Sequence, residues 1–388
     1  MRRISLAIGV FISVYHAAAW ADEIPSFQLL GVLTDYHSSG AGDVTPDGTV
    51  IVGTSWRYGP YEYEACRWTG DGTVIGLGDL PGYLVQSAAN AVSADGNVIV
   101  GYGTHDTSRH HAFRWTAEEG MVDLGDFPGG PDHSEAWGVS ADGQTVVGFG
   151  RRYDASEAFR WTAEEGMVGL GFLPEYGSSW ADAISSDGAT IVGSGDDGYG
   201  SRQAFRWTPE DGMVGLGDLP GGAWPFESFA YGVSADGRII VGQGESWYGN
   251  EAMRWTEDDG MIGLGDLPGG PYDSAAVGVT ADGAIIVGQG ETDWGEEAFF
   301  WTEEHGMRRL QDVLEDDYGL DLGGWRPIGA DISDDGQFIA GSAENPDGYR
   351  QAFLARIPEP GTLLLTMVSV LALALARPLL SAQGETRR

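Results

Sequence analysis

Aspartate precedes glycine at seven regularly spaced positions, and carboxylates are the usual groups of acid–base chemistry on sugars. A glycoside hydrolase needs two carboxylates in different environments, one that donates a proton and one that stays ionised. The seven Asp-Gly pairs have nearly the same neighbours, so the pattern favours an aspartate that caps its own turn before a glycine of positive φ. No catalytic residue is predicted among Asp47, Asp95, Asp142, Asp187, Asp236, Asp282 and Asp335.

Aromatic residues gather in the segments between these turns and could bind sugar rings. Trp and Tyr pack against the C–H groups of a sugar while nearby Asp, Glu or Arg meet its hydroxyls. The alternative is that these side chains only fill space between adjacent loops. The predicted ligand-binding residues are Trp56, Tyr58, Tyr61, Trp180, Trp224, Phe226, Trp247, Tyr248 and Trp294.

Two acidic, glycine-containing segments could bind calcium, which is the one cofactor that the sequence suggests. Asp196 and Asp197 form one, and Asp316, Asp317 and Asp321 form the other. Neither matches the twelve-residue loop of a known calcium motif. A solvated acidic face is the alternative interpretation.

A zinc site is not favoured by the single adjacent histidine pair, His110 and His111. Zinc requires three or four ligands, and no third ligand lies near in the sequence. In the repeat described below, His111 aligns with Glu157 and Gln203, which we expect to be solvated.

The chain of 388 residues has a formal net charge of -37, and all 21 of its basic residues are arginine. Such an acidic field repels nucleic acid and anionic lipid headgroups. Cys66 is the only cysteine, which excludes an internal disulfide and a Cys-rich metal site. It stands where other copies of the repeat have Phe or Met, so we expect a core residue rather than a reactive thiol.

Most of the chain consists of a repeat of about 46 residues. Each copy contains, in the same order, an Asp-Gly turn, a Val-Gly run, an Ala-Phe-Arg-Trp motif and a Gly-Leu-Gly motif, with variations. In one copy, four strands are expected at 139–140, 145–148, 158–162 and 167–173. Asp-Gly between β-branched runs is a strong hairpin signal. Four strands per repeat predict the blade of a β-propeller, and seven copies predict seven antiparallel blades. A β-solenoid, built from shorter repeats, is the alternative.

The two ends of this array complement each other. Residues 27–33 align with 167–173, the last strand of a unit, while the array finishes at 351–353, the third strand of a unit. The N-terminal strand is therefore expected to complete the last blade, which removes an exposed sheet edge. Strand alternation places the Asp-Gly and Glu-Glu-Gly turns on one face and the longer, aromatic loops on the opposite face.

Both chain termini have the pattern of processing signals. A basic and then apolar segment ends at Ala19-Trp20-Ala21, which predicts a signal peptide over 1–21. After Pro358-Glu359-Pro360 comes an apolar run at 361–376, then Arg377 and a basic tail, which predicts a short transmembrane helix.

The order Pro-Glu-Pro, hydrophobic helix and basic tail resembles the PEP-CTERM sorting signal of bacterial surface proteins. The resemblance implies export, transient anchoring in the membrane, and processing by an exosortase-type enzyme in addition to signal peptidase. The apolar run is shorter than the roughly 20 residues that span a bilayer. A hydrophobic tail docked on the body is the alternative.

The body resembles the bacterial extracellular HAF-repeat family, whose motif is present at His111-Ala112-Phe113 and, with Glu or Gln first, in other copies. The family supplies no catalytic residues. The sequence thus predicts three parts, a signal peptide at 1–21, a propeller at 22–356 and a sorting segment at 357–388. We expect a monomeric, exported, non-enzymatic module that binds extracellular polysaccharide or envelope proteins. A polysaccharide hydrolase or lyase that works through the loop-rich face is the alternative.

Overall fold

The computed structural model describes residues 24–57, 62–81, 86–104, 109–222 and 227–358. Residues Phe27–Ala355 form one compact unit. No helix among the described residues is long and apolar enough to cross a membrane. Several residues singled out in the sequence lie outside the described part of the chain: Ala19, Ala21, Tyr58, Tyr61, Trp224, Phe226, Glu359, Pro360 and Arg377.

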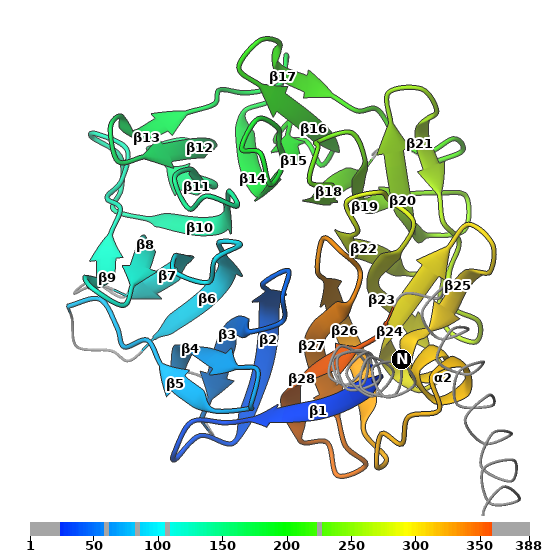
Figure 1. Ribbon diagram of the computed structural model, residues 1–388. Coiled ribbons are helices and arrows are strands. Elements are labelled where there is room, and N and C mark those ends of the chain that lie inside the picture. Colours follow the sequence, from blue (N-terminus) through cyan, green and yellow to red (C-terminus); the bar gives the residue numbers. More distant parts are fainter. Residues whose placement is uncertain (1–23, 58–61, 82–85, 105–108, 223–226, 359–388) are drawn as a thin grey trace, which may run out of the picture. The chain divides into compact units, whose positions relative to one another are not determined.

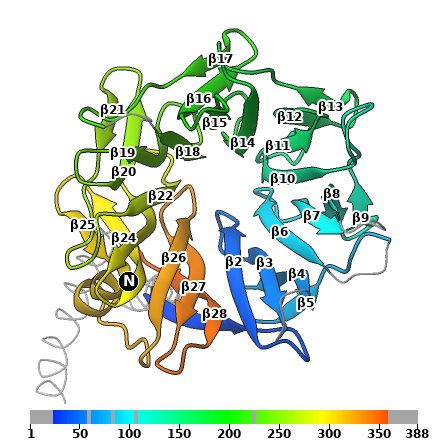
Figure 2. The same ribbon diagram turned by 180° about the vertical axis from the view of Figure 1, so that it is seen from behind.

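The described residues form seven four-stranded antiparallel sheets, arranged as the blades of a propeller (Figure 1), and Figure 2 shows the same ring from behind. Each blade begins with a strand next to the central axis. These inner strands are β2 (Ser38–Val44), β6 (Ser87–Val92), β10 (Ser134–Val139), β14 (Ser178–Ile184), β18 (Ser228–Val233), β22 (Ser274–Val279) and β26 (Arg326–Ile332). The second strands are β3 (Val50–Trp56), β7 (Ile99–Thr104), β11 (Val146–Arg151), β15 (Ile191–Asp196), β19 (Ile240–Glu245), β23 (Ile286–Thr292) and β27 (Phe338–Glu344).

The third strand of each blade carries the Ala-Phe-Arg-Trp motif or its variant. These strands are β4 (Tyr63–Thr69), β8 (His110–Thr116), β12 (Ser156–Thr162), β16 (Arg202–Thr208), β20 (Asn250–Thr256), β24 (Gly295–Thr302) and β28 (Arg350–Arg356). The outer strands are β5 (Val74–Gly76), β9 (Gly120–Asp123), β13 (Gly166–Gly169), β17 (Gly212–Gly215), β21 (Gly260–Gly263), β25 (Gly306–Arg309) and β1 (Ser26–Gly31). A helical turn, α2 (Leu310–Asp312), and a π-helical turn at Val313–Asp317 follow β25.

The Asp-Gly turns have the structural role that the sequence predicts. In the third blade, Asp142 accepts hydrogen bonds from the Ser140 hydroxyl at 2.6 Å and from the Gln144 amide at 3.0 Å. Gly143 has a φ of 68°, a region that favours glycine. The hydrogen bond from Ser140, together with the backbone one, holds the pKa of Asp142 below its ordinary value. These aspartates are therefore fully used in capping their turns.

A buried serine at the start of the inner strand joins one blade to the next. Ser179 donates to the carbonyl of Gly171 at 2.8 Å and accepts from the amide of Ala158 at 3.0 Å, both in the preceding repeat. The same two bonds recur, among the described residues, at Ser39, Ser87, Ser134, Ser228 and Ser274. Each serine satisfies a donor and an acceptor that would otherwise be buried without partners.

We expect Ser179→Ala to lower the free energy of unfolding by about 1–3 kcal/mol, because it leaves the Ala158 amide and the Gly171 carbonyl unpaired in the interior. Chemical denaturation followed by tryptophan fluorescence measures the change. Ser178→Ala is the matched control, since that neighbouring side chain is only half-buried and accepts one longer bond of 3.3 Å. Equal stability of the two variants would contradict the role given to Ser179.

The ring closes as the sequence predicts, with β1 beside β28 in the sheet that β26 begins. Ser39 of the first inner strand bonds to Gly31 of β1 at 2.7 Å and to Ala352 of β28 at 3.0 Å. Phe27 stacks on Phe353 with ring centroids 5.3 Å apart. The closing junction thus uses the same serine contacts as the junctions within the chain, and the β-solenoid alternative is excluded.

Cys66 is a core residue, as predicted. Its side chain is fully buried in a cluster that includes Ile51, Trp68 and Ala352. Burial raises the pKa of the Cys66 thiol to about 12, which keeps the thiol protonated at neutral pH.

Candidate functional site

Each inner strand contains a β-bulge, and the bulges determine which side chains face the central axis. In the third blade the strand register shifts between Ala136 and Gly138, so Trp137 is left without a partner. Bulges commonly redirect a side chain next to a binding site. In the first six blades the bulged residues differ widely in chemistry, and all of them line the central cavity: Gly42, Asn90, Trp137, Asp182, Tyr231 and Val277.

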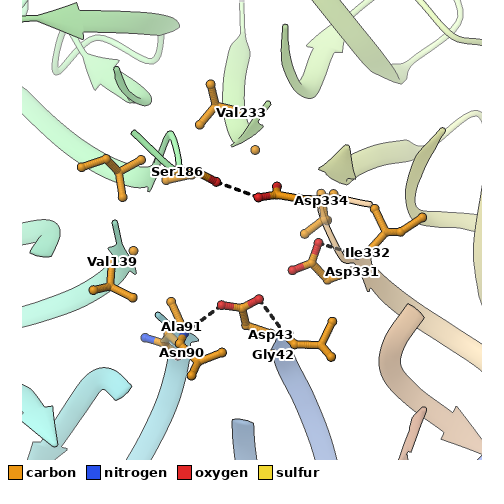
Figure 3. Close-up of a pocket in the computed structure, with 18 of the residues that line it drawn as sticks. Gly42, Asp43, Asn90, Ala91, Val139, Ser186, Val233, Asp331, Ile332 and Asp334 are labelled. Atoms are coloured by element: carbon orange, nitrogen blue, oxygen red, sulfur yellow. Dashed lines mark hydrogen bonds between the residues drawn. The ribbon is translucent and has the colours of Figure 1, made fainter. Parts of the chain in front are cut away.

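The central cavity has a volume of about 340 Å³ and contains four carboxyl groups without a basic side chain in its lining. Asp43 comes from the first blade, and Asp331 and Asp334 come from the last (Figure 3). Asp182 comes from the fourth blade. Asp43 accepts hydrogen bonds from the backbone amides of Val44 at 2.6 Å and of Val92, in the next blade, at 2.8 Å.

Burial raises the pKa values of three of these acids, Asp43, Asp182 and Asp331. The pKa of Asp182 rises to about 7 through burial alone. The pKa of Asp331 rises to about 6, again mainly because of burial. Burial and then repulsion from Asp331 raise the pKa of Asp43, although the amides of Val92 and Val44 oppose the shift. The cavity therefore holds carboxyl groups that are partly protonated near neutral pH.

At the face that carries the Asp-Gly turns, residues just before the turns connect opposite sides of the ring. Ser186 of the fourth blade donates to Asp334 of the seventh at 2.8 Å (Figure 3). The amide of Ala141 donates to the carbonyl of Ser186 at 3.1 Å, and the amide of Ala281 donates to that of Asp334 at 2.8 Å. The Ser186–Asp334 bond crosses the ring at the turn face, and the other two bonds join neighbouring blades there, so we expect a ligand to approach from the loop-rich face.

On the loop-rich side, half-buried rings from the second to the fourth blade contact one another in a row, and this row begins what we call the aromatic arc. Neighbouring ring centroids lie 4.4 to 6.5 Å apart. The guanidinium of Arg202 continues the row, at 5.6 Å from the ring of Trp180 and 5.5 Å from that of Phe229. The arc consists of Tyr102, His110, His133, Phe149, Trp180, Arg202 and Phe229.

Two bulged residues connect the arc to the cavity. Trp137 lies 6.5 Å from Tyr102, and Tyr231 stacks on Phe229 at 5.8 Å. Both line the cavity, and Trp137 is 40% exposed. Trp137 and Tyr231 therefore link the aromatic arc to the acidic cavity.

Within the arc, two histidines converge on a single carboxylate. His110 Nδ1 lies 2.7 Å from Glu135 Oε1, and His133 Nε2 lies 3.5 Å from the same oxygen. Burial would raise the pKa of Glu135, but the hydrogen bonds from the two histidines outweigh it and hold the pKa below its ordinary value. One possible ligand atom from each of the three side chains, His110, His133 and Glu135, lies within 4.8 Å of the other two. Among the described residues, this is the group of His, Cys, Asp or Glu side chains close enough together to hold a metal ion.

The aromatic residues that the sequence predicts to bind a ligand do not form one surface. Trp180 belongs to the aromatic arc. Trp56 ends β3 and is 39% exposed. Trp247 and Tyr248, in the β19–β20 loop, are 80% and 78% exposed, and Trp294, in the β23–β24 loop, is 77% exposed. Trp247, Tyr248 and Trp294 thus lie outside the ring contacts that define the arc.

The predicted calcium ligands already have partners within the protein. Asp196 accepts from the Gly198 amide and from Arg202, and Asp197 accepts from two backbone amides of its own loop. Asp317 forms a bidentate pair with Arg308, and Asp321 accepts from the Gly323 amide. Asp316 lies in the π-helical turn. Calcium at either segment remains a prediction.

The expectation that His111 occupies a solvated position was wrong. His111 is 8% exposed, Glu157 is 6% exposed, and Gln203 is half-buried. A Cβ on Gly169 would lie 2.2 Å from Glu157 Oε1, so the glycine of the outer strand makes room for the acid. In the second blade this pair becomes His111 and Asp123, joined at 3.1 Å. This position serves packing between the third and outer strands.

No protein-family model matches the chain, and no curated protein matches it either. The chain is similar in fold to an oligogalacturonate lyase in complex with manganese, with a TM-score of 0.55, 13% identity, and 87% and 97% of the two chains covered. It is similar to an oligogalacturonate lyase from Vibrio parahaemolyticus, with a TM-score of 0.54, 10% identity, and 87% and 98% covered. It is also similar to the β-propeller domain of the Trilobed protease from Pyrococcus furiosus, with a TM-score of 0.53, 12% identity, and 82% and 95% covered. At these identities the similarity supports the propeller fold alone.

Proposed function

We propose that the protein is a ligand-binding propeller that holds an extracellular glycan along the aromatic arc. The observation that carries this proposal is the row of partly exposed rings across four blades, with Glu135 and Arg202 beside them. Rings supply apolar surface for the C–H groups of sugars, and the charged side chains accept or donate hydrogen bonds to hydroxyls.

Charge narrows the class of glycan to neutral chains. The protein carries a net charge of -37, and the cavity beneath the arc is lined by four carboxyl groups. A polyuronate or sulfated chain would be repelled by both, whereas a neutral oligosaccharide would meet no such penalty. Neutral glucans, mannans, galactans and N-acetylglucosamine chains are therefore the ligands to screen.

Trp180→Ala is expected to weaken binding of the best oligosaccharide by about 5- to 30-fold, because truncating an aromatic residue at a binding centre costs about 1–2 kcal/mol. Calorimetric titration against a panel of neutral oligosaccharides measures the change. Trp294→Ala is the matched control, since its exposed ring lies outside the arc and should alter affinity less than about twofold. Absence of binding to any neutral glycan, or an equal loss in both variants, would refute the arc as the binding surface.

A hydrolase or lyase acting on a neutral or weakly charged polysaccharide is the second candidate. It is favoured by the raised pKa values of Asp182 and Asp331 in a cavity that adjoins the arc. A protonated carboxyl beside an ionised one is the arrangement that acid–base catalysis on sugars requires. This activity would release shorter products from the screened glycans and disappear in Asp331→Asn, whereas a pure binding module releases none.

We also propose that the chain is exported and sorted to the cell envelope or extracellular matrix. The support is in the sequence, in the segment at 1–21 and in the Pro-Glu-Pro, apolar and basic order at 358–388. Signal peptidase and an exosortase-type enzyme would be its processing partners. Intact mass of the mature protein tests both cleavages, which should fall after Ala21 and near Glu359.

A further inference from the structure

We propose that His110, His133 and Glu135 form a binding site for a divalent first-row transition-metal ion of the zinc class. The site lies at the junction of the second and third blades, because His110 begins β8 while His133 and Glu135 belong to the entry of β10. The proposal does not depend on glycan binding. The three residues depart from the residues that other copies of the repeat have at the same positions.

Comparison with the other junctions shows that this one departs from the repeat. The first residue of the third strand lies beside the residue that precedes the buried serine of the next blade. At two other junctions this contact joins side chains of complementary polarity, Arg202 with Glu227 and Asn250 with Asp273, and at the first junction it joins Tyr63 with Gln86. At the second junction it joins two imidazoles, which stack at 5.6 Å. Two imidazoles side by side can both bind one metal ion, and a protein zinc site then needs at least one further ligand.

Glu135 is that further ligand, and it is also an exception within the repeat. The corresponding position of the inner strand is Gly40, Ala88, Trp180, Phe229 or Ala275 in other blades, as the strand register shows. Among the first six blades, only the third blade has an acid at this position, and its Glu135 lies next to the two imidazoles. A carboxylate and two histidines therefore occur together at one junction, where the fold alone would accept small or aromatic residues.

The distances fit a metal of zinc size. Ligand atoms bonded to zinc at about 2.0–2.2 Å in tetrahedral geometry lie roughly 3.3–3.5 Å apart. His133 Nε2 and Glu135 Oε1 already have that separation, at 3.5 Å. His110 Nδ1 and Glu135 Oε1, at 2.7 Å, would need to separate by less than about 1 Å. Small rotations of two half-buried side chains supply this movement.

Surrounding groups hold the histidines in place. The second ring nitrogen of His110, Nε2, lies 3.4 Å from the Tyr63 hydroxyl, and Tyr102 stacks on the same ring at 4.4 Å. A hydrogen-bond partner on the nitrogen that does not bind the metal is usual for histidine ligands. Phe149 lies 5.8 Å from the ring of His133. Both imidazoles are thus oriented toward the carboxylate before any ion arrives.

The donor set selects the class of metal. Two imidazoles and one carboxylate suit zinc, nickel, cobalt or copper, whereas calcium and magnesium prefer oxygen ligands alone. Three protein ligands leave a fourth position for water or for an oxygen atom of a bound molecule. The proposed site is therefore distinct in chemistry from the acidic segments considered for calcium.

Zinc titration of the full chain in competition with a chromogenic chelator tests the proposal. An excess of magnesium is added, so that surface carboxylates do not contribute. We expect one equivalent of Zn²⁺ to bind at micromolar or tighter affinity. The repeat itself supplies conservative substitutions, His110→Asn as in Asn250, His133→Ser as in Ser178 and Glu135→Ala as in Ala88. Each should weaken Zn²⁺ binding by more than about 100-fold, beyond the 10- to 100-fold typical of groups that only orient a ligand.

His111→Gln is the matched control, since Gln203 fills the same position in the fourth blade and His111 is bound to Asp123 instead. It should leave Zn²⁺ affinity unchanged. X-ray absorption of the zinc-loaded wild-type protein gives a second readout that needs no variant, and it should show two imidazole ligands. Failure of the wild type to bind Zn²⁺ stoichiometrically, undiminished binding in the three variants, or fewer than two imidazoles would overturn the proposal.

Discussion

Leu30→Asp is expected to remove the cooperative unfolding transition or to lower the free energy of unfolding by more than about 5 kcal/mol. Leu30 is 1% exposed and lies in β1, where it packs with Ile51, Trp68 and Leu354. Truncating such a leucine costs about 2–5 kcal/mol, and burying a carboxylate in its place adds several more. Single domains are stable by only about 5–15 kcal/mol, so detachment of β1 would leave little stability.

The effect should be specific to the closing strand. Thr34→Asp adds the same charge four residues later, at an exposed position, and should change stability by less than about 0.5 kcal/mol. Guanidinium denaturation of both variants, followed by tryptophan fluorescence and circular dichroism, measures the difference. A Leu30→Asp variant as stable as Thr34→Asp would mean that the ring does not depend on β1.

Most of the fold can be predicted from the repeat, because each copy carries its own strand and turn signals. The Asp-Gly turns, the four strands per copy and the pairing of the first strand with the last blade all follow from spacing and alignment. The buried serines escaped the sequence analysis, although Ser134 and its equivalents recur at a fixed distance before six of the seven turns. Their role depends on contacts between consecutive copies, which the pattern within a single copy does not reveal.

The candidate site was predicted only in part, for a physical reason. Trp180 was expected to be in a binding surface and lies in the aromatic arc. The other members of the arc come from consecutive blades, and the packing of each blade against the next brings their side chains together. His110 lacked a third ligand in its own segment, yet Glu135 reaches it from the next blade at 2.7 Å. The sequence does carry a signal for this site, because His110 and Glu135 are positions where one copy departs from the repeat, and such positions are candidates for function.

The bulges explain why the cavity acids were also missed. A bulge shifts strand alternation by one residue, so Asp182 faces the axis although simple alternation does not predict its direction. The repeat requires no acid at this position, which is Gly42 or Val277 in other copies. Asp182 is therefore half-buried in the cavity at a cost in stability, and that cost can be measured.

Asp182→Asn is expected to stabilise the protein by roughly 2–4 kcal/mol at pH 8 and to have little effect at pH 4. The pKa of Asp182 is about 7 in the folded protein, against an ordinary value of 3.8. Between these two values the folded state holds a proton that the unfolded chain releases, so the free energy of unfolding falls as the pH rises. Asparagine has the same size and cannot ionise, and it therefore removes this loss.

Denaturant titrations of wild type and variant from pH 4 to pH 8 measure this difference. Asp154→Asn is the control, because it removes one negative charge from an exposed loop and so separates general charge repulsion from local burial. Its effect should stay within about 0.5 kcal/mol across the range. A constant difference between Asp182→Asn and wild type at all pH values would show that the carboxyl of Asp182 is ionised in the folded protein. In that case the surroundings of Asp182 would be well hydrated, and the acid–base activity considered for the cavity would lose one of its two candidate proton donors, since a group ionised at neutral pH has no proton to give.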